Sequence, residues 1–282
     1  MRFEKWQALG NDYLIFERGA LPWELTPERI RRLCESHTGI GADGILVLSR
    51  ENPRYEAELR IFNPDGSEAE LSGNGVRQAA LYIGRDGWSG SVASAEFSIL
   101  TRAGEIQATM TSRDTATLEM GRASVTSADF PSGGPDGTGM VESGGREWSF
   151  QHVSIGNPQC VIEVGQEVED LDLQAIGPAI EHSDLFPNRT NVSFIRIDGA
   201  TVRARIFERG VGETTASGTG ASGAAVAASL RGSPSPITVQ LDGGELVVEI
   251  SEELDVKLTG TASCVYRGEI SGDLAHELSA LG

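Results

Sequence analysis

The chain has few cysteines and no long apolar stretch. Its three cysteines, Cys34, Cys160 and Cys264, are odd in number and widely spaced. That excludes a disulfide framework and a zinc motif. Free thiols suit a reducing compartment, so we expect a cytoplasmic protein. No run of about 18 apolar residues is present, which argues against a membrane span. Residues 1–6 lack the apolar core of a signal peptide.

Basic residues are also scarce, with 23 Lys and Arg against 41 Asp and Glu, giving a net charge of −18. So acidic a chain repels phosphate backbones, which argues against a nucleic-acid partner. The acidic residues are spread along the sequence and fit a solvated surface. The length of 282 residues and the 39% hydrophobic content suit two globular domains, each with its own core.

One unit of sequence occurs twice. Residues 60–62, Arg-Ile-Phe, recur at 205–207, and Ser72-Gly73-Asn74-Gly75 recurs as Ser217-Gly218-Thr219-Gly220, at the same offset of 145. Gly10-Asn11 matches Gly156-Asn157 at an offset of 146, and residues 104–106 match 244–246 at 140. Small loop insertions in one copy explain why the offset varies between 140 and 146. Because solenoid periods are far shorter, the repeat predicts two like domains.

Hydrophobic patterns predict more strands than helices. We expect strands at 13–16, 45–48, 57–62, 95–100 and 105–110, and then at 150–155, 160–164, 192–197, 202–207, 236–241 and 245–250. Helices are expected at 27–37, 76–83, 173–182 and 221–230, with a flexible Pro-, Gly- and Ser-rich loop at 131–145.

The pattern indicates an α+β fold of two pseudo-symmetric domains, each a curved mixed or antiparallel sheet wrapped around a central helix. Residues 1–118 with 265–282 would form one domain, and residues 119–264 the other.

Each repeated Ser-Gly-x-Gly turn precedes an Ala-rich helix. The plain reading is that Ser72 and Ser217 are N-caps. The functional reading is that amides at a helix start bind an anion, and that two such starts grip one carboxylate and face one atom across a cleft. The same field would stabilise the enediolate that forms when the carbon beside a carboxylate loses its proton.

Polar residues occupy matched positions in the two halves. Asn11 and Asn157 follow a turn glycine, while Asn63 and Glu208 follow the Arg-Ile-Phe repeat, with Arg209 next. Turn asparagines often bind only their own backbone. No cluster has metal-ligand spacing and no nucleotide-binding fingerprint is present, so no metal or cofactor is expected.

A set of motifs resembles the diaminopimelate epimerase family, in order and over nearly the whole chain. They are Gly10-Asn11-Asp12, residues 39–44 (Gly-Ile-Gly-Ala-Asp-Gly), residues 62–68 (Phe-Asn-Pro-Asp-Gly-Ser-Glu), residues 72–77 (Ser-Gly-Asn-Gly-Val-Arg), Gly156-Asn157-Pro158, Thr190-Asn191, residues 208–214 (Glu-Arg-Gly-Val-Gly-Glu-Thr) and Leu258-Thr259-Gly260.

The resemblance implies a PLP-independent epimerase that interconverts LL- and meso-diaminopimelate in lysine and cell-wall biosynthesis. In the family, two cysteines, one from each half, act as base and acid on opposite faces of the α-carbon. By the same motifs, the carboxylate would lie on the amides of Gly73-Asn74 and Gly218-Thr219. Glu208 would meet the α-amino group or tune the acid/base pair. The remaining substrate contacts would be Asn11, Asn63, Asn157, Asn191 and Arg209. The implied partner is a small amino acid or dicarboxylate, and a homodimer is an expectation.

The sequence departs from the family at the proton-transfer positions. Ser72 and Ser217 stand where the family has cysteine, and Gln159 stands where the family has histidine. Gln78 also replaces a frequent cysteine. A serine hydroxyl is a weak base unless a neighbouring group activates it. We therefore expect a poor epimerase.

Three explanations stay open. The chain could be an epimerase with both cysteines replaced to trap a ligand, although Gln159 and Gln78 are not needed for that. It could instead be a paralogous isomerase of a carboxylate with a more acidic C–H bond. The third explanation is a non-catalytic binder of an amino acid or dicarboxylate.

Overall fold

The computed structural model describes residues 1–85 and 96–281, in two compact units. The first unit comprises Met1–Leu118 with Gly260–Gly282, and the second Glu119–Thr259. The chain enters the second unit within strand β8 (Thr115–Arg122) and leaves it within β17 (Asp255–Thr261). The return therefore falls at Gly260, inside a continuous strand, rather than after Cys264.

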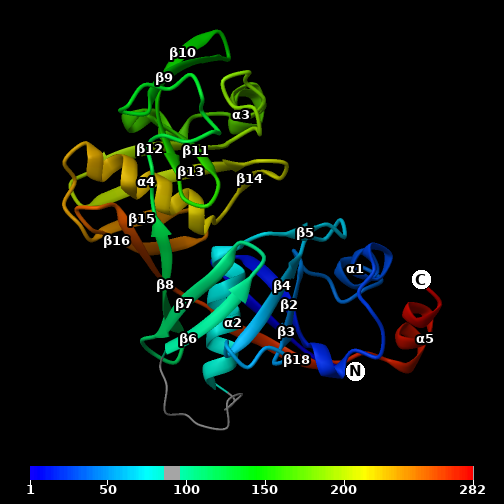
Figure 1. Ribbon diagram of the computed structural model, residues 1–282. Coiled ribbons are helices and arrows are strands. Elements are labelled where there is room, and N and C mark those ends of the chain that lie inside the picture. Colours follow the sequence, from blue (N-terminus) through cyan, green and yellow to red (C-terminus); the bar gives the residue numbers. More distant parts are fainter. Residues whose placement is uncertain (86–95, 282) are drawn as a thin grey trace. The chain divides into compact units, whose positions relative to one another are not determined.

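The described residues of the first unit form strands, three α-helices and a short 3-10 helix, with α2 at the centre (Figure 1). Its other elements are β1 (Arg2–Ala8), β2 (Asn11–Glu17), η1 (Arg18–Ala20), α1 (Pro27–Cys34), β3 (Ile45–Ser49), β4 (Ala57–Phe62), β5 (Glu68–Ala69), β6 (Glu96–Thr101), β7 (Gly104–Met110), β18 (Ser263–Glu269) and α5 (Gly272–Ala280), and α2 itself spans Gly73–Arg85.

The second unit is built in the same way around helix α4 (Gly218–Leu230). Its other elements are β9 (Thr138–Ser143), β10 (Arg146–Ser154), β11 (Pro158–Glu163), η2 (Gly165–Glu169), α3 (Leu173–Glu181), β12 (Asn191–Asp198), β13 (Thr201–Glu208), β14 (Gly212–Thr214), β15 (Ile237–Leu241) and β16 (Gly244–Ile250).

Strand pairing confirms the duplication read from the sequence. In the first unit β2 pairs parallel with β3, β3 antiparallel with β4, β4 parallel with β6, and β6 antiparallel with β7. In the second unit β11, β12, β13, β15 and β16 repeat that order with the same directions. Each unit is thus a mixed sheet, and the predicted α+β class is correct.

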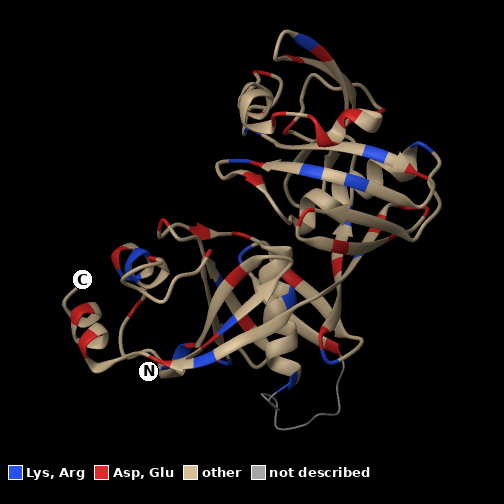
Figure 2. Cartoon of the chain, turned by 180° about the vertical axis from the view of Figure 1, so that it is seen from behind, with Lys and Arg blue, Asp and Glu red and all other residues tan. Residues whose placement is uncertain are grey.

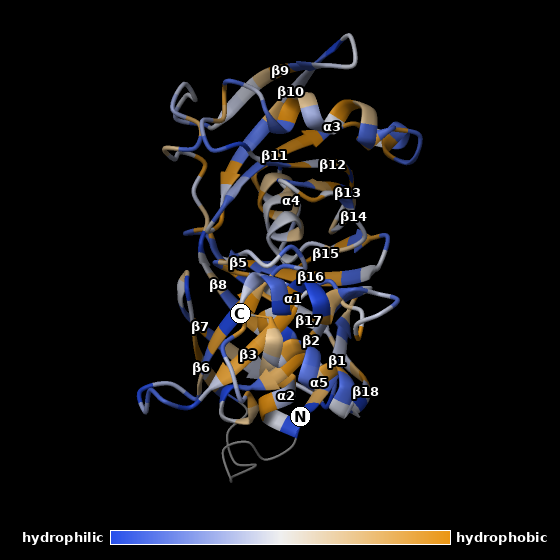
Figure 3. Cartoon of the chain, turned by 90° about the vertical axis from the view of Figure 1, so that its right-hand side faces the viewer, coloured by the Kyte–Doolittle hydropathy of each residue, from blue (hydrophilic) through white to orange (hydrophobic). Residues whose placement is uncertain are grey.

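Each sheet curves around one buried helix, as predicted. Helix α4 contacts β10–β13, β15 and β16, and α2 contacts β1–β4, β6 and β7. Helix α4 has Gly, Ala and Ser on all sides, and residues 218–228 are all buried. Such a helix has no solvent face and is stable only inside a sheet. In α2 the buried Val76, Leu81 and Ile83 contribute about 1.5–3 kcal/mol each. Figure 3 shows the apolar strands that surround both helices.

Helix α1 begins where expected and ends earlier. The Thr26 side chain caps it and Pro27 is its first residue. We expected it to reach His37, but it stops at Cys34. The reason is that the Glu35 carboxylate accepts the amides of His37 and Thr38, which turns the chain out of the helix.

The prediction of a structureless loop at 131–145 is wrong in its second half. Strand β9 occupies Thr138–Ser143 and pairs antiparallel with β10. Val141 is buried there, and Gly144 and Gly145 form the hairpin turn with positive φ. The strand was missed because Val141 is its one buried apolar residue, beside the buried Ser143. Of the strand expected at 95–100, residue 95 lies outside the described residues.

Acidic side chains are spread over both units (Figure 2), as expected for a solvated surface. In the described part of the chain, no helix combines the length and the apolar character that a membrane span needs.

Candidate active site

Both Gly-Asn turns connect neighbouring antiparallel strands. Gly10 lies between β1 and β2, and Gly156 lies between β10 and β11, with φ of 88° and 77°. Backbone of this kind favours glycine. The next residue in each turn, Asn11 or Asn157, is thereby held beside the central helix of its own unit.

Both serines cap their helices. The Ser72 hydroxyl oxygen accepts the Gly75 amide at 3.0 Å, and the Ser217 oxygen accepts the Gly220 amide at 3.2 Å. The capping interpretation of the sequence is therefore confirmed. It does not exclude a chemical role, because a hydroxyl oxygen that accepts hydrogen bonds still carries its own proton.

Within each unit the structure brings the two motifs together. The Asn74 side-chain amide donates to the Asn11 oxygen at 3.3 Å, and Asn157 donates to the Thr219 hydroxyl at 3.2 Å. Asn74 and Thr219 are the second residues of their helices, at repeat-related positions. Two like polar clusters result, one at the start of α2 and one at the start of α4. The face-to-face placement of the two turns stays a prediction from the repeat.

In the second unit Glu208 accompanies the serine. It ends β13, and its carboxylate accepts the Thr214 hydroxyl at 2.8 Å. Burial raises the pKa of Glu208, while hydrogen bonds from Thr214 and Ser217 partly oppose that shift. The residue as a whole is half-buried, and burial of its carboxyl group disfavours the charged form. A carboxyl group with a raised pKa is a stronger base than usual, which suits proton transfer with a neighbouring hydroxyl.

In the first unit the serine's titratable neighbour is Tyr13, which sequence reasoning missed. The Tyr13 hydroxyl donates to the Ser72 oxygen at 3.2 Å. Gly44 makes room for the ring, since a Cβ there would lie 2.7 Å from Tyr13 Cε1. A signal was available: Tyr13 stands two residues after Asn11, as Gln159 stands two after Asn157.

Gln159 and Gln78 fill the space beside the two clusters. The Gln159 amide donates to the Asn157 oxygen at 2.6 Å, and its stem packs against Gly223 of α4. Gln78 donates to the Asn11 carbonyl oxygen at 3.1 Å. Both side chains are fully buried, and the amide oxygen of each lacks a partner in the described residues. Neither glutamine titrates, so each can orient a cluster but cannot act as its base.

The remaining predicted residues have more local partners. Asn63 donates to the Ser67 hydroxyl within its own turn. Asn191 is buried; its amide donates to the Pro158 carbonyl and its oxygen accepts the Arg209 backbone amide at 2.9 Å. The Arg209 guanidinium donates to the Asn188 carbonyl. Asn191 and Arg209 are thus joined, with Glu208 next in the chain.

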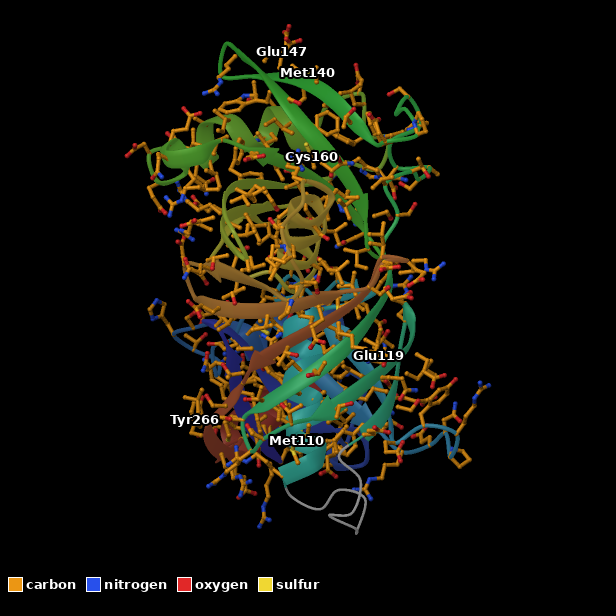
Figure 4. The ribbon with its side chains drawn as sticks, turned by 90° about the vertical axis from the view of Figure 1, so that its left-hand side faces the viewer. Met110, Glu119, Met140, Glu147, Cys160 and Tyr266 are labelled. Atoms are coloured by element: carbon orange, nitrogen blue, oxygen red, sulfur yellow. The ribbon has the colours of Figure 1, made fainter. Side chains whose placement is uncertain are left out.

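None of the three thiols is placed to replace a serine. Burial raises the pKa of Cys34 to about 12 and that of Cys264 to about 11. Burial also holds the pKa of Cys160, which lies among the strands of the second unit (Figure 4), well above its usual value. Such thiols stay protonated and unreactive near neutral pH.

One cavity lies elsewhere. It measures about 840 Å³ and belongs to the first unit, where Met110 and Tyr266 (Figure 4) lie on its wall with Cys264. Among its described lining residues none is a predicted site residue. In the described part of the chain no three His, Cys, Asp or Glu side chains gather in a way that could hold a metal ion.

Sequence comparison identifies the family. The sequence model described as diaminopimelate epimerase matches residues 3–126 and 151–265. "Diaminopimelate epimerase 2" of Nostoc sp. is 38% identical over 97% of both chains. The diaminopimelate epimerase of Moorella thermoacetica is 40% identical over 97% of this chain and all of its own length. The chain belongs to the diaminopimelate epimerase family.

Solved structures share the fold at lower identity. A hydroxyproline epimerase from Agrobacterium vitis superposes with a TM-score of 0.68 and 18% identity, over 97% of this chain and 93% of its own. A Bacillus anthracis protein of the PhzF family gives 0.66 and 18%, over 96% and 99%. At such identities the likeness concerns the fold, and it agrees with the two-domain α+β architecture.

Proposed function

We propose that this chain binds diaminopimelate and inverts one α-carbon by a two-base route without PLP, slowly because serines hold both acid/base positions. The main support is the pair of repeat-related clusters, each with an asparagine from the Gly-Asn turn bonded to the second residue of a serine-capped helix. A diaminopimelate epimerase of this architecture needs two such groups, one for each face of the carbon.

The reacting carboxylate would lie on the backbone amides of Gly73-Asn74 and Gly218-Thr219. Amides at the start of a helix donate to an anion, and the helix dipole adds to the attraction. Loss of the α-proton sends charge into this carboxylate, so the same donors stabilise the enediolate more strongly than the substrate. The binding half of the mechanism thus needs no thiol.

Proton transfer depends on what accompanies each serine. At Ser217, the neighbouring Glu208 carboxylate can accept the hydroxyl proton while the serine oxygen takes the α-proton. At Ser72, the Tyr13 phenol can replace a proton that the serine hydroxyl delivers to the other face. One C–H bond breaks and one forms. At the end Glu208 has gained a proton and Tyr13 has lost one. A relay through a weakly basic hydroxyl is slower than direct transfer by a thiolate.

Arg209 and the asparagines would hold the far end of the substrate. The Asn191 oxygen fixes the Arg209 backbone amide, and one guanidinium nitrogen donates to Asn188. A guanidinium has five donors, so enough remain for a bidentate bond to a distal carboxylate.

The test is to incubate the purified protein with LL-diaminopimelate in deuterated water and to follow α-deuterium and the meso isomer. We expect binding measurable by calorimetry, with deuterium incorporation and inversion far slower than a metabolic enzyme would show. Turnover at an ordinary enzymatic rate would contradict the role given to the serines, and absence of binding would contradict the substrate.

A second function is favoured by one observation: among the described residues a carboxyl group, that of Glu208, is hydrogen-bonded to Ser217 and none to Ser72. A single carboxyl could move a proton on one face of an unsaturated acid with a more acidic C–H bond. That isomerase would exchange protons with retained configuration and would not invert diaminopimelate. The third reading, a non-catalytic binder, predicts tight binding with no exchange at all.

A further inference from the structure

A buried cation, Arg77, lies in the first turns of α2, and no carboxylate of the described residues pairs with it. Arg77 has no solvent exposure. Its Nε donates to the Thr261 carbonyl at 3.1 Å and its Nη2 to the Asn74 side-chain oxygen at 2.8 Å. Its Nη1 is buried and has no partner among the described residues. A guanidinium in this position keeps its charge although burial lowers its pKa to about 10.

The absence of a nearby carboxylate matters energetically. A buried charge is costly unless an opposite charge or ligand compensates it. In the described residues no Asp or Glu forms an ion pair with Arg77, and desolvation is the sole influence on its pKa. Arg29 of α1, which is also buried, differs: its Nε donates to the Leu278 carbonyl and its Nη1 to the Glu24 carbonyl, and it belongs to neither cluster.

Arg77 also begins a chain of hydrogen bonds through the α2 cluster. The Asn74 oxygen accepts from Arg77, so its amide nitrogen faces Asn11, to whose oxygen it donates at 3.3 Å. The Asn11 amide in turn donates to the Asp43 carboxylate at 3.1 Å. A cation at one end and an anion at the other fix the orientation of both asparagines. Arg77 therefore fixes the directions in which the side-chain N–H groups of Asn74 and Asn11 point.

The two repeat-related clusters differ in charge. At the offset of 145, Arg77 corresponds to Ser222 of α4, whose hydroxyl donates to the Gly218 carbonyl. The start of α2 thus has a buried cation within one turn, and the start of α4 has a neutral side chain. The cluster at the start of α2 therefore attracts an anion more strongly than the cluster at the start of α4.

We propose that Arg77 is the positioning and charge-compensating residue of the carboxylate site, orienting Asn74 and Asn11 and receiving its counter-charge when a carboxylate occupies the start of α2. This inference rests on the proposed function for the identity of the amino acid. The class of ligand, a carboxylate, follows from the buried charge and the amide-bearing helix start.

The test compares Arg77→Met and Arg77→Lys with Arg29→Met, a matched loss of a buried arginine in the same unit. Calorimetry with LL-diaminopimelate and with pimelate, the same dicarboxylate without amino groups, gives the affinities. We expect Arg77→Met to weaken both ligands at least ten-fold, Arg77→Lys to restore part of the loss, and Arg29→Met to lower stability with affinity unchanged. Unchanged affinity in a folded Arg77→Met variant would overturn the inference.

If Arg77→Met does not fold, the Asn74→Asp variant tests the role proposed for Arg77. It places a carboxylate 2.8 Å from the guanidinium, at the present oxygen position. We expect a higher unfolding midpoint and weaker binding of both ligands, because the internal anion competes with the external one. A variant that is no more stable and binds normally would refute the role of Arg77. If pimelate binding depends on Arg77 and diaminopimelate does not bind, the proposed function fails while this inference stands.

Discussion

Restoring thiols at the two serines is the most informative perturbation, because it separates capping from chemistry. In Ser72→Cys/Ser217→Cys, two hydroxyl caps, at 3.0 and 3.2 Å from the Gly75 and Gly220 amides, become weakly accepting sulfurs. Loss of a good cap costs about 1 kcal/mol. We expect the free energy of unfolding in urea to fall by about 2 kcal/mol for the pair.

Activity should change in the opposite direction. A thiol at a helix start has a lowered pKa and is partly ionised near neutral pH. A well-placed acid/base group contributes about 10²–10⁴-fold in rate, so α-deuterium incorporation from LL-diaminopimelate should rise at least about 100-fold. Each single variant should exchange the α-proton on its own face faster than it inverts the carbon, because the opposite face still depends on serine.

Ser271→Cys is the matched control. Ser271 caps α5 by accepting the Leu274 amide at 3.2 Å, and it belongs to neither cluster. It should lose about 1 kcal/mol of stability, the value expected for one cap, with no gain in exchange. NMR in deuterated water supplies the rates and urea unfolding supplies the stabilities. If the double variant folds and binds diaminopimelate but exchanges no faster than wild type, the serines do not occupy the acid/base positions.

Three further predictions follow from the surroundings of the serines. Burial raises the pKa of Glu208 above 4.5, so the unfolded chain releases this proton first and stability falls as pH rises from that value towards the folded pKa. The free energy of unfolding in urea of Glu208→Gln, relative to wild type, should therefore be higher at pH 8 than at pH 4, by about 1.4 kcal/mol for each unit by which the pKa is raised. The same difference between variant and wild type at both pH values would refute this. Tyr13→Phe should cost about 0.5–1.5 kcal/mol and slow exchange, whereas Tyr82→Phe, at the other end of α2, should leave exchange unchanged. Gly44→Ala places a Cβ 2.3 Å from the Phe62 carbonyl oxygen and should cost about 1–3 kcal/mol in thermal unfolding, against little for Gly19→Ala, which meets nothing within 4 Å.

The sequence by itself determined the duplication, the fold class and the two serine-capped helix starts. These depend on local rules: a Gly-Asn turn with positive φ, a serine that accepts its own helix's amide, and a helix such as α4 whose small side chains leave it no solvent face. The same rules concealed β9, whose buried residues are Val141 and Ser143. A strand is recognised from alternating apolar residues, and a single buried apolar residue gives no such alternation.

Only the tertiary structure decided which distant groups meet. Tyr13 reaches Ser72 from strand β2, and Arg77 of α2 finds a partner in the Thr261 carbonyl near the end of the chain. The raised pKa of Glu208 likewise comes from burial, which no spacing along the chain encodes. Hydrogen bonds and desolvation act over a few ångströms in space, whatever the separation in sequence. The residues that surround a proton-transfer group are therefore set by packing, while the turn that presents it is set by the local sequence.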